Sequence, residues 1–308
     1  MKGVLPVVAR RLVSGLVTIV LVVTMIFILV RLAGDPASII LGDDSSAEEL
    51  ARFRERHGLD QPLPQQWLKY VINAAQGDFG QSFRYGEPAW PIVVERLPAT
   101  LQLGALGLAL SLLIAIPIGV YASVKPGSVV DTVSRMIAVA GQSMPIFWLG
   151  ILLIIVFSIN LQWLPAVGAG SWRHLVLPSI ALSIYSTPLT MRLVRSSMLE
   201  VLGQEYIMTA RSKGLSEGRV LVSHGLRNAS IPVITIIGLR VGHVVGGTVV
   251  LEEVFAYPGM GRLAIDSMRL LDYAVIQVFI IVVTGLIVII NLMTDILYSV
   301  VDPRIRTG

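Results

Sequence analysis

The sequence has no cysteine and little charge. Its 308 residues include no Cys, so neither a disulfide framework nor a Cys-based metal site is available. Only 14% of the residues are charged, against about 25% in a typical soluble domain. At the same time 54% are hydrophobic, and the mean hydropathy is +0.76. These figures exclude an ordinary soluble domain and indicate a membrane protein.

Motifs for nucleotide, metal and nucleophilic chemistry are also missing. A Walker-type loop needs Gly followed by Lys, but the four lysines follow Met, Leu, Val and Ser. The four histidines are scattered, without an H-E-x-x-H motif, and no G-x-S-x-G elbow is present. We therefore expect no catalytic residues, no metal site and no cofactor in this chain, which is not predicted to be an enzyme.

Six apolar runs have about the length needed to cross a bilayer core as helices. They predict an all-α membrane protein with six transmembrane helices. The runs cover residues 12–30, 99–123, 136–159, 175–194, 231–251 and 276–299.

The distribution of Lys and Arg predicts the orientation of these helices. Lys2, Arg10 and Arg11 precede the first run, which places both the N- and C-terminus in the cytoplasm. In this topology, with Arg192 at the inner end of the fourth run counted among them, the inner segments hold 13 basic and 5 acidic residues, and the outer segments 10 basic and 14 acidic. The net charge of +4 is thus a topology signal, and no nucleic-acid partner is needed to explain it. A cleaved signal peptide is the alternative for the first run, but its length and the lack of an A-x-A site disfavour cleavage.

The long segment after the first run predicts a small extracytoplasmic domain. Ser46 is a candidate N-cap, Glu48 and Glu49 suit a first helical turn, and Gly58 is a candidate helix stop. Several aromatic residues give the insert something to pack, although a loosely ordered linker is the alternative. The predicted organisation is therefore an N-terminus with the first helix (1–30), an insert (31–98) and a five-helix core (99–308) that contains a cytoplasmic segment at 195–230.

The fifth run carries the sharpest internal pattern. Gly238, Gly242 and Gly246 recur every four residues and predict close packing against another helix, within the chain or in a dimer. Arg240 lies among them and either lines a translocation pathway or caps backbone carbonyls at a subunit contact. His243 is expected to be packed or hydrogen-bonded rather than a ligand. Four prolines in the predicted helices, Pro117, Pro145, Pro178 and Pro188, are expected to bend or end them.

The cytoplasmic segment between the fourth and fifth runs predicts a helix, a turn and a second helix. One helical face can be shared by Met198, Leu199, Leu202, Tyr206, Thr209 and Ala210. After that face, Gly214 fits a left-handed turn position and Ser216 can cap the next helix. The modest apolar face suits a protein groove better than lipid, while a plain basic loop is the alternative.

A resemblance to a known family covers nearly the whole chain. The stretch "EYIMTARSKGLSEGRVLVSHGLRN" resembles the cytoplasmic "EAA" loop of ATP-binding-cassette (ABC) importer permeases, in the form found in dipeptide and oligopeptide permeases. The chain is most similar to the subunit type with an extracytoplasmic insert. Further similar stretches are "GDPA" (34–37), "FGQSFRYGEP" (79–88), "ERLPATLQL" (95–103), "PIFWLGILL" (145–153), "LEEVFAYPGMGRL" (251–263) and "VDPRIR" (301–306).

This resemblance implies a coupling helix that sits in a groove of a cytoplasmic ATPase. The interface residues carried over by position are Glu205, Tyr206, Thr209, Ala210, Arg211, Lys213 and Gly214. Met208, Thr209 and Arg227 depart from the general importer pattern but fit the peptide subgroup.

The implied protein is the permease subunit of a peptide importer in a prokaryotic cell membrane. Its implied partners are a homologous permease, two ABC ATPases that bind ATP and Mg, an extracytoplasmic substrate-binding protein and membrane lipid. Import of nickel complexes, haem or glutathione is the alternative within the family. A stand-alone secondary transporter or channel is the alternative outside it, disfavoured because no inverted repeat is apparent.

Overall fold

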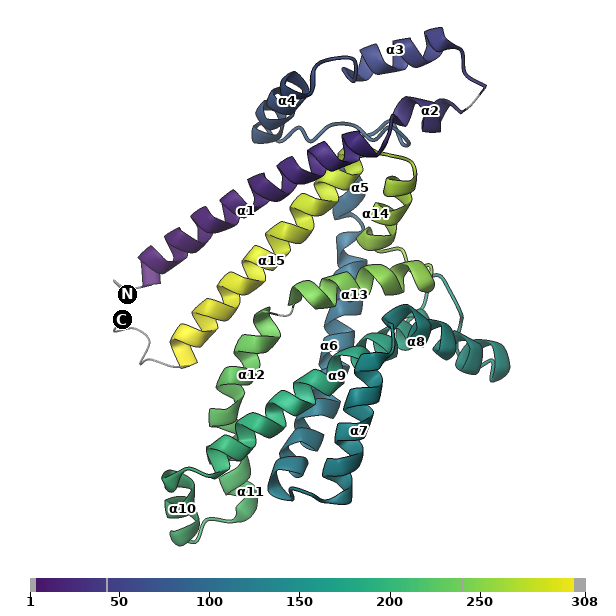
Figure 1. The fold of residues 1–308 in the computed structure, drawn as a ribbon. Helices are drawn as coiled ribbons and strands as arrows, with labels where there is room; N and C mark the ends of the chain where they lie inside the picture. The colour runs from purple at the N-terminus through teal and green to yellow at the C-terminus, as the bar shows by residue number, and fades with distance from the viewer. Residues whose placement is uncertain (1–3, 43, 240, 302–308) are drawn as a thin grey trace. The chain divides into compact units, whose positions relative to one another are not determined.

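The computed structural model describes residues 4–42, 44–239 and 241–301, and these residues form helices joined by short loops (Figure 1). The chain divides into two compact units, which are described separately. One consists mainly of residues 101–257 with the C-terminal part from 289 onward. The other consists of residues 5–100 and 258–288.

The unit of residues 5–100 and 258–288 contains the predicted insert. Its helices are α1 (Val4–Ala33), α2 (Pro36–Leu41), α3 (Ala47–His57), α4 (Leu63–Ala75), α5 (Ala89–Val94), α14 (Met260–Arg269) and the first part of α15 (Tyr273–Val301). The predicted limits of α3 are confirmed. The Ser46 hydroxyl accepts the backbone N–H of Glu49 at 3.2 Å, and the Glu49 carboxylate accepts the N–H of Ser46 at 2.9 Å. Gly58 ends the helix with φ +65°.

Aromatic rings pack the insert onto the helices beside it. Phe27 of α1 lies 5.2 Å, centroid to centroid, from Trp67 of α4. His57 lies 4.9 Å from Phe83, whose ring is 5.7 Å from that of Tyr273 at the start of α15. The insert is therefore a packed element rather than a loose linker. Its position outside the cytoplasm remains a prediction.

The unit built around residues 101–257 is organised about a long central helix. Its helices are α6 (Leu97–Val124), α7 (Val129–Ser143), α8 (Ile146–Leu153), η1 (Ile154–Asn160), α9 (Arg173–Leu202), α10 (Glu205–Ser212), α11 (Glu217–Arg219), η2 (Val220–Leu226), α12 (Arg227–Leu239) and α13 (Val241–Val254). Helix α9 packs against α7, α8, α12 and α13. Gly107 of α6 lies so close to Leu182 of α9 that an added Cβ would come within 2.5 Å of it. Small residues thus let these two helices approach closely.

Three stretches of the described residues are helical, long and apolar enough to cross a membrane: Val13–Ala33, Ala89–Val124 and Tyr273–Thr294. A bent pair, Val129–Gly141 and Ile146–Asn160, adds a fourth if it counts as one span. The predicted spans 175–194 and 231–251 are not among them. The first lies in α9, which also carries Arg192 and Arg195. The count of six spans and their orientation remain predictions.

Two of the predicted spans differ in shape from the expectation. The predicted span 136–159 is not one straight helix, because its two parts meet at 103°. Pro145 is the N-cap residue of α8, so this proline ends a helix as expected. Helices α6 and α9, in contrast, continue through Pro117, Pro178 and Pro188. The predicted span 231–251 is divided between α12 and α13, which run in different directions, and Arg240 between them lies outside the described residues (Figure 1).

Candidate functional site

The segment after α9 folds into a small elbow made of α10, the turn 213–216, α11 and η2. It lies beyond the ends of α9 and α12 (Figure 1). Its interior is a cluster of Ile207, Ala210 and Val220, with exposed fractions of 0%, 6% and 0%. Val201, Leu202 and Leu215 pack around that cluster. The elbow therefore has an apolar core that holds α10 against the end of α9 and the start of η2.

Gly214 makes the turn between the two parts of the elbow. Its φ of +77° is left-handed, a conformation that favours glycine. The N–H of Gly214 donates to the carbonyl of Arg211 at 2.9 Å, and the N–H of Leu215 donates to that of Ala210 at 3.4 Å. These bonds satisfy the carbonyls at the end of α10. The predicted left-handed turn at Gly214 is confirmed, while its place in an ATPase interface stays a prediction.

The second helix of the elbow begins where expected but without the expected cap. Ser216 is the N-cap residue of α11, yet its side chain makes no capping hydrogen bond. An ion pair stabilises the turn instead. The Arg211 guanidinium contacts the Glu217 carboxylate with N–O distances of 2.8 and 3.3 Å. This role of Glu217 is not apparent from the sequence, because Arg211 and Glu217 meet only across the turn.

The outer face of α10 is polar and exposed. Glu205, Tyr206, Thr209 and Lys213 are all exposed there, together with Met208, which is 60% exposed. Ala210, grouped with them in the sequence analysis, instead faces the elbow's core. The predicted shared face was wrong because α9 ends at Leu202 and α10 starts a new helix at Glu205, which resets the helical phase.

Hydrogen bonds between helices join the elbow to the rest of its unit. The Asn228 side-chain amide of α12 donates to the Tyr206 hydroxyl at 3.1 Å. Two turns before the end of α9, Arg195 makes two hydrogen bonds to the buried Asp131 carboxylate of α7, at 2.7 and 3.0 Å. The same carboxylate accepts the N–H of Gly127 at 2.9 Å. These hydrogen bonds join α10 to α12, and α9 to α7.

The predicted glycine stripe does not act as one surface. Gly238 is buried in α12, and a side chain there would collide with Thr294 of α15. Close packing within the chain is therefore confirmed for this residue. Gly242 of α13 is half-buried, whereas Gly246 is exposed with no atom within 4 Å of its Cβ position. The predicted pathway residue Arg240 and the side chain of His243 lie outside what the structure describes.

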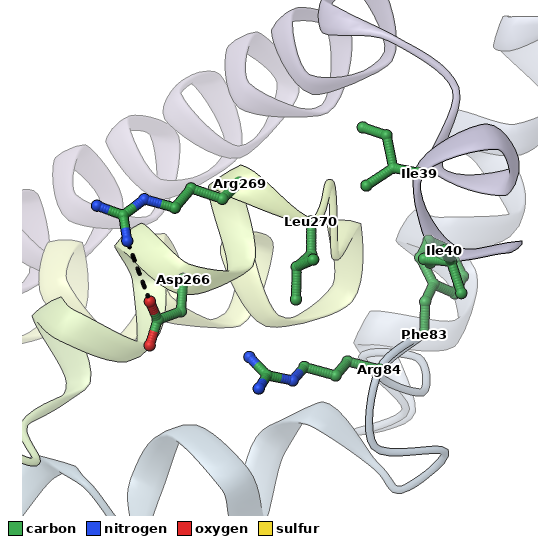
Figure 2. A pocket seen from close by; sticks show the side chains of 7 residues that line it. All are labelled: Ile39, Ile40, Phe83, Arg84, Asp266, Arg269 and Leu270. Carbon is green, nitrogen blue, oxygen red and sulfur yellow. Dashed lines mark ion pairs between the residues drawn. The ribbon is translucent and has the colours of Figure 1, made fainter. Parts of the chain in front are cut away.

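The unit that contains the insert holds two polar cavities. One, of about 510 Å³, lies between α2, α14 and the loop before α5, and is lined by Ile39, Ile40, Phe83, Arg84, Asp266, Arg269 and Leu270 (Figure 2). Figure 2 shows the ion pair between Asp266 and Arg269, with an N–O distance of 3.6 Å, at one side of it. The other cavity, of about 340 Å³, opens between α1, α3, α4 and the start of α15. Among the described residues, no group of three or more His, Asp or Glu could hold a metal ion.

The described residues are helical, with several helices long and apolar enough to cross a membrane, and comparisons with known proteins identify the family. Residues 115–307 match the family described as binding-protein-dependent transport system inner membrane component, and residues 4–104 match the N-terminal family of such components. The chain belongs to this family.

Curated relatives extend the match over nearly the whole chain. The glutathione transport system permease protein GsiC of Escherichia coli K12 is 42% identical over 97% of this chain and 98% of its own length. GsiC of Salmonella choleraesuis SC-B67 is 41% identical over the same shares. The chain is thus a permease subunit of an ABC importer, a multi-pass protein of the inner membrane.

Solved structures share the fold. The MetNI methionine ABC transporter in an inward-facing conformation aligns with a TM-score of 0.56 and 18% identity over 68% of this chain and 96% of that one. An amino acid ABC transporter crystallised with histidines aligns with a TM-score of 0.51 and 16% identity over 70% and 94%. At this identity the likeness shows the fold alone.

Proposed function

We propose that the chain forms half of a translocation pathway for small peptides, with glutathione among the cargoes. The support is the 42% identity, over 97% of this chain, to a permease named for glutathione transport, which is itself a tripeptide. The peptide-permease form of the elbow sequence agrees with this class of cargo. No observation favours nickel complexes or haem.

We further propose that the elbow is the surface on which a cytoplasmic ATPase acts. Its outer face carries the polar residues Glu205, Thr209 and Lys213 together with Tyr206 and the exposed Met208, while Ile207, Ala210 and Val220 are buried in its core. Such a surface fits a protein groove better than a lipid surface. Closure of two ATPases on ATP would then move α9 and α12 as rigid bodies between two states of the pathway. The proposed assembly holds a second permease, two ATPases and a substrate-binding protein, and ATP and Mg belong to the ATPases.

Uptake by the reconstituted transporter tests the cargo. Proteoliposomes containing this chain, its partner permease, the ATPases and the binding protein are given ATP and labelled glutathione, dialanine or nickel. We expect ATP-dependent uptake of glutathione or dialanine, and none of nickel. Uptake of nickel without either peptide would overturn the proposed cargo.

Single-cysteine variants test the docking surface. The chain has no native cysteine, so the introduced residue is its only thiol. Thr209→Cys places a thiol on the outer face of α10. Val167→Cys, at a residue 53% exposed in the loop after η1, is the matched control on the predicted opposite side of the membrane. A bifunctional reagent should cross-link the Thr209→Cys chain to the ATPase and leave the control uncross-linked. Equal cross-linking of both variants, or of neither, would rule out the docking role of α10.

A further inference from the structure

The 340 Å³ cavity in the insert has features of a ligand site, and none of its lining residues belongs to the elbow. Its floor is formed by buried or half-buried residues of α1, α4 and α15, among them Arg31, Tyr70 and Gln277. Its rim carries the exposed charged residues Arg56, Lys69 and Asp78. All of these residues belong to one compact unit, so the cavity does not depend on how the two units are arranged.

Two buried polar atoms at this cavity have no hydrogen-bond partner among the described residues. They are the hydroxyl of Tyr70 and the side-chain amide nitrogen of Gln277, a residue only 3% exposed. Burial raises the pKa of Tyr70 to about 12, against the opposing effect of the Arg31 guanidinium, so its hydroxyl keeps its proton. Both groups can therefore donate a hydrogen bond. Buried donors without acceptors cost stability, and proteins keep few of them without a reason.

Positive charge gathers at the same cavity without acidic partners. Arg31, Arg56 and Lys69 make no ion pair with any carboxylate of the described residues. Arg31 is held in place by its Nε, which donates to the Gln66 side-chain oxygen at 2.7 Å, and by the ring of Phe27, 3.4 Å from its central carbon. These contacts fix the position of the Arg31 side chain and leave its positive charge without a carboxylate partner among the residues described. An oxyanion in the cavity would meet fixed donors and fixed positive charge.

Asp78 distinguishes between the possible anions. One oxygen of this carboxylate accepts the N–H of Gly80 at 2.9 Å, and the side chain makes no ion pair with a basic residue among the described residues. A phosphate dianion would be repelled by Asp78, whereas a molecule with one carboxylate and one ammonium group would be attracted at both ends. Aromatic walls, including Phe79 and Tyr273, can cover the apolar part of such a molecule.

We propose that this cavity binds a small zwitterion, an amino acid or short peptide, whose carboxylate accepts from Tyr70, Gln277 and Arg31 and whose ammonium group faces Asp78. The ligand class overlaps with the proposed cargo, but the site is separate from the elbow. It is tested by binding rather than by uptake. Uptake of peptide without binding in this cavity would contradict the proposed site and leave the proposed cargo standing. Binding in this cavity without uptake would contradict the proposed cargo and leave the proposed site standing.

The test measures binding of labelled dialanine to the purified full-length chain in detergent. Competitors are unlabelled dialanine, dialanine with both termini blocked, and inorganic phosphate. Only the unlabelled free dipeptide should compete. Tyr70→Phe and Gln277→Leu should each weaken binding about tenfold, as expected for loss of one hydrogen bond to a charged group. Gln65→Leu, at an exposed position of α4 outside the cavity, is the matched control and should bind as the unaltered chain does.

Thermal unfolding of each variant keeps the result interpretable. Tyr70→Phe removes a buried hydroxyl that has no partner among the described residues of the unliganded chain, so its unfolding temperature should be at least as high as that of the Gln65→Leu control. If blocked dialanine or phosphate competes as well as free dialanine, the ligand class is wrong. If Tyr70→Phe folds normally and binds as tightly as the control, or if dialanine does not bind at all, the cavity holds water and the proposal fails.

Discussion

At the scale of single residues, Gly214 shows how one backbone angle shapes the elbow. Its φ of +77° is costly for any residue with a Cβ, although nothing lies within 4 Å of where that Cβ would be. Gly214→Ala should therefore cost about 1 kcal/mol through conformation alone. Gly218→Ala is the matched control, because Gly218 is equally open but lies within α11.

Thermal unfolding in detergent measures both changes. We expect a lower unfolding temperature for Gly214→Ala and an unchanged or higher one for Gly218→Ala, since Ala favours a helix. The same effect of both substitutions would show that the left-handed turn does not require glycine at position 214.

His57 is a second residue whose surroundings predict a measurable effect. Burial lowers its pKa, and the nearby Arg56 lowers it further. A base whose pKa is lower in the folded state takes up its proton first in the unfolded state, so acid weakens the fold. Stability should fall as the pH drops from the usual pKa of His, about 6.5, through the lowered pKa of the folded state, and then level off. His57→Phe should remove this part of the pH dependence of thermal unfolding, and an unchanged profile would contradict the assignment.

At the scale of elements, the close contact between α6 and α9 requires glycine at position 107. An added Cβ would lie 2.5, 2.7 and 2.8 Å from three atoms of Leu182, including Leu182 Cβ, so rotation of that side chain cannot relieve the clash. Gly107→Ala should cost about 1–3 kcal/mol, the usual effect of overpacking. Gly285→Ala in α15 meets no atom within 4 Å and serves as the control. Equal unfolding temperatures for the two variants would show that α6 and α9 are not in contact.

The ion pair between α7 and α9 is a second link between elements. Asp131 has no exposed surface and bonds twice to Arg195, while Glu48 pairs with Arg52 on an exposed face of α3. Asp131→Asn leaves the Arg195 charge without its partner, whereas Glu48→Gln removes a solvated pair worth little. We expect a clear loss of thermal stability only for Asp131→Asn. A loss as large for Glu48→Gln would contradict this ranking of the two pairs.

At the scale of the whole molecule, measurements of ATP hydrolysis and of uptake distinguish the proposed role of the ATPases from that of this chain. The chain lacks a Gly-Lys pair, so the purified chain should not hydrolyse ATP, and the assembled transporter should. Arg240→Leu should reduce uptake strongly while leaving assembly with the ATPases intact, if that arginine lines the pathway. Uptake that stays unchanged would exclude this role and leave contact with backbone carbonyls as its explanation.

The class of protein and several local features follow from the sequence alone. Long apolar runs define a membrane protein because hydrocarbon excludes charged residues, and the Ser46, Gly58 and Gly214 positions follow from local backbone chemistry. These inferences needed no knowledge of distant contacts. The elbow's turn could be predicted for the same reason.

Only the tertiary structure decided which faces are covered and where long helices break. The phase of α10 depends on the end of α9 at Leu202, so Ala210 faces inward and Met208 outward. The neighbours of Gly238 and Gly246 differ although their spacing is regular, because a helix packs against one and not the other. The insert cavity joins Arg31, Tyr70 and Gln277 from three helices far apart in the sequence. Burial and partner choice arise from non-local packing, which no short stretch of sequence encodes.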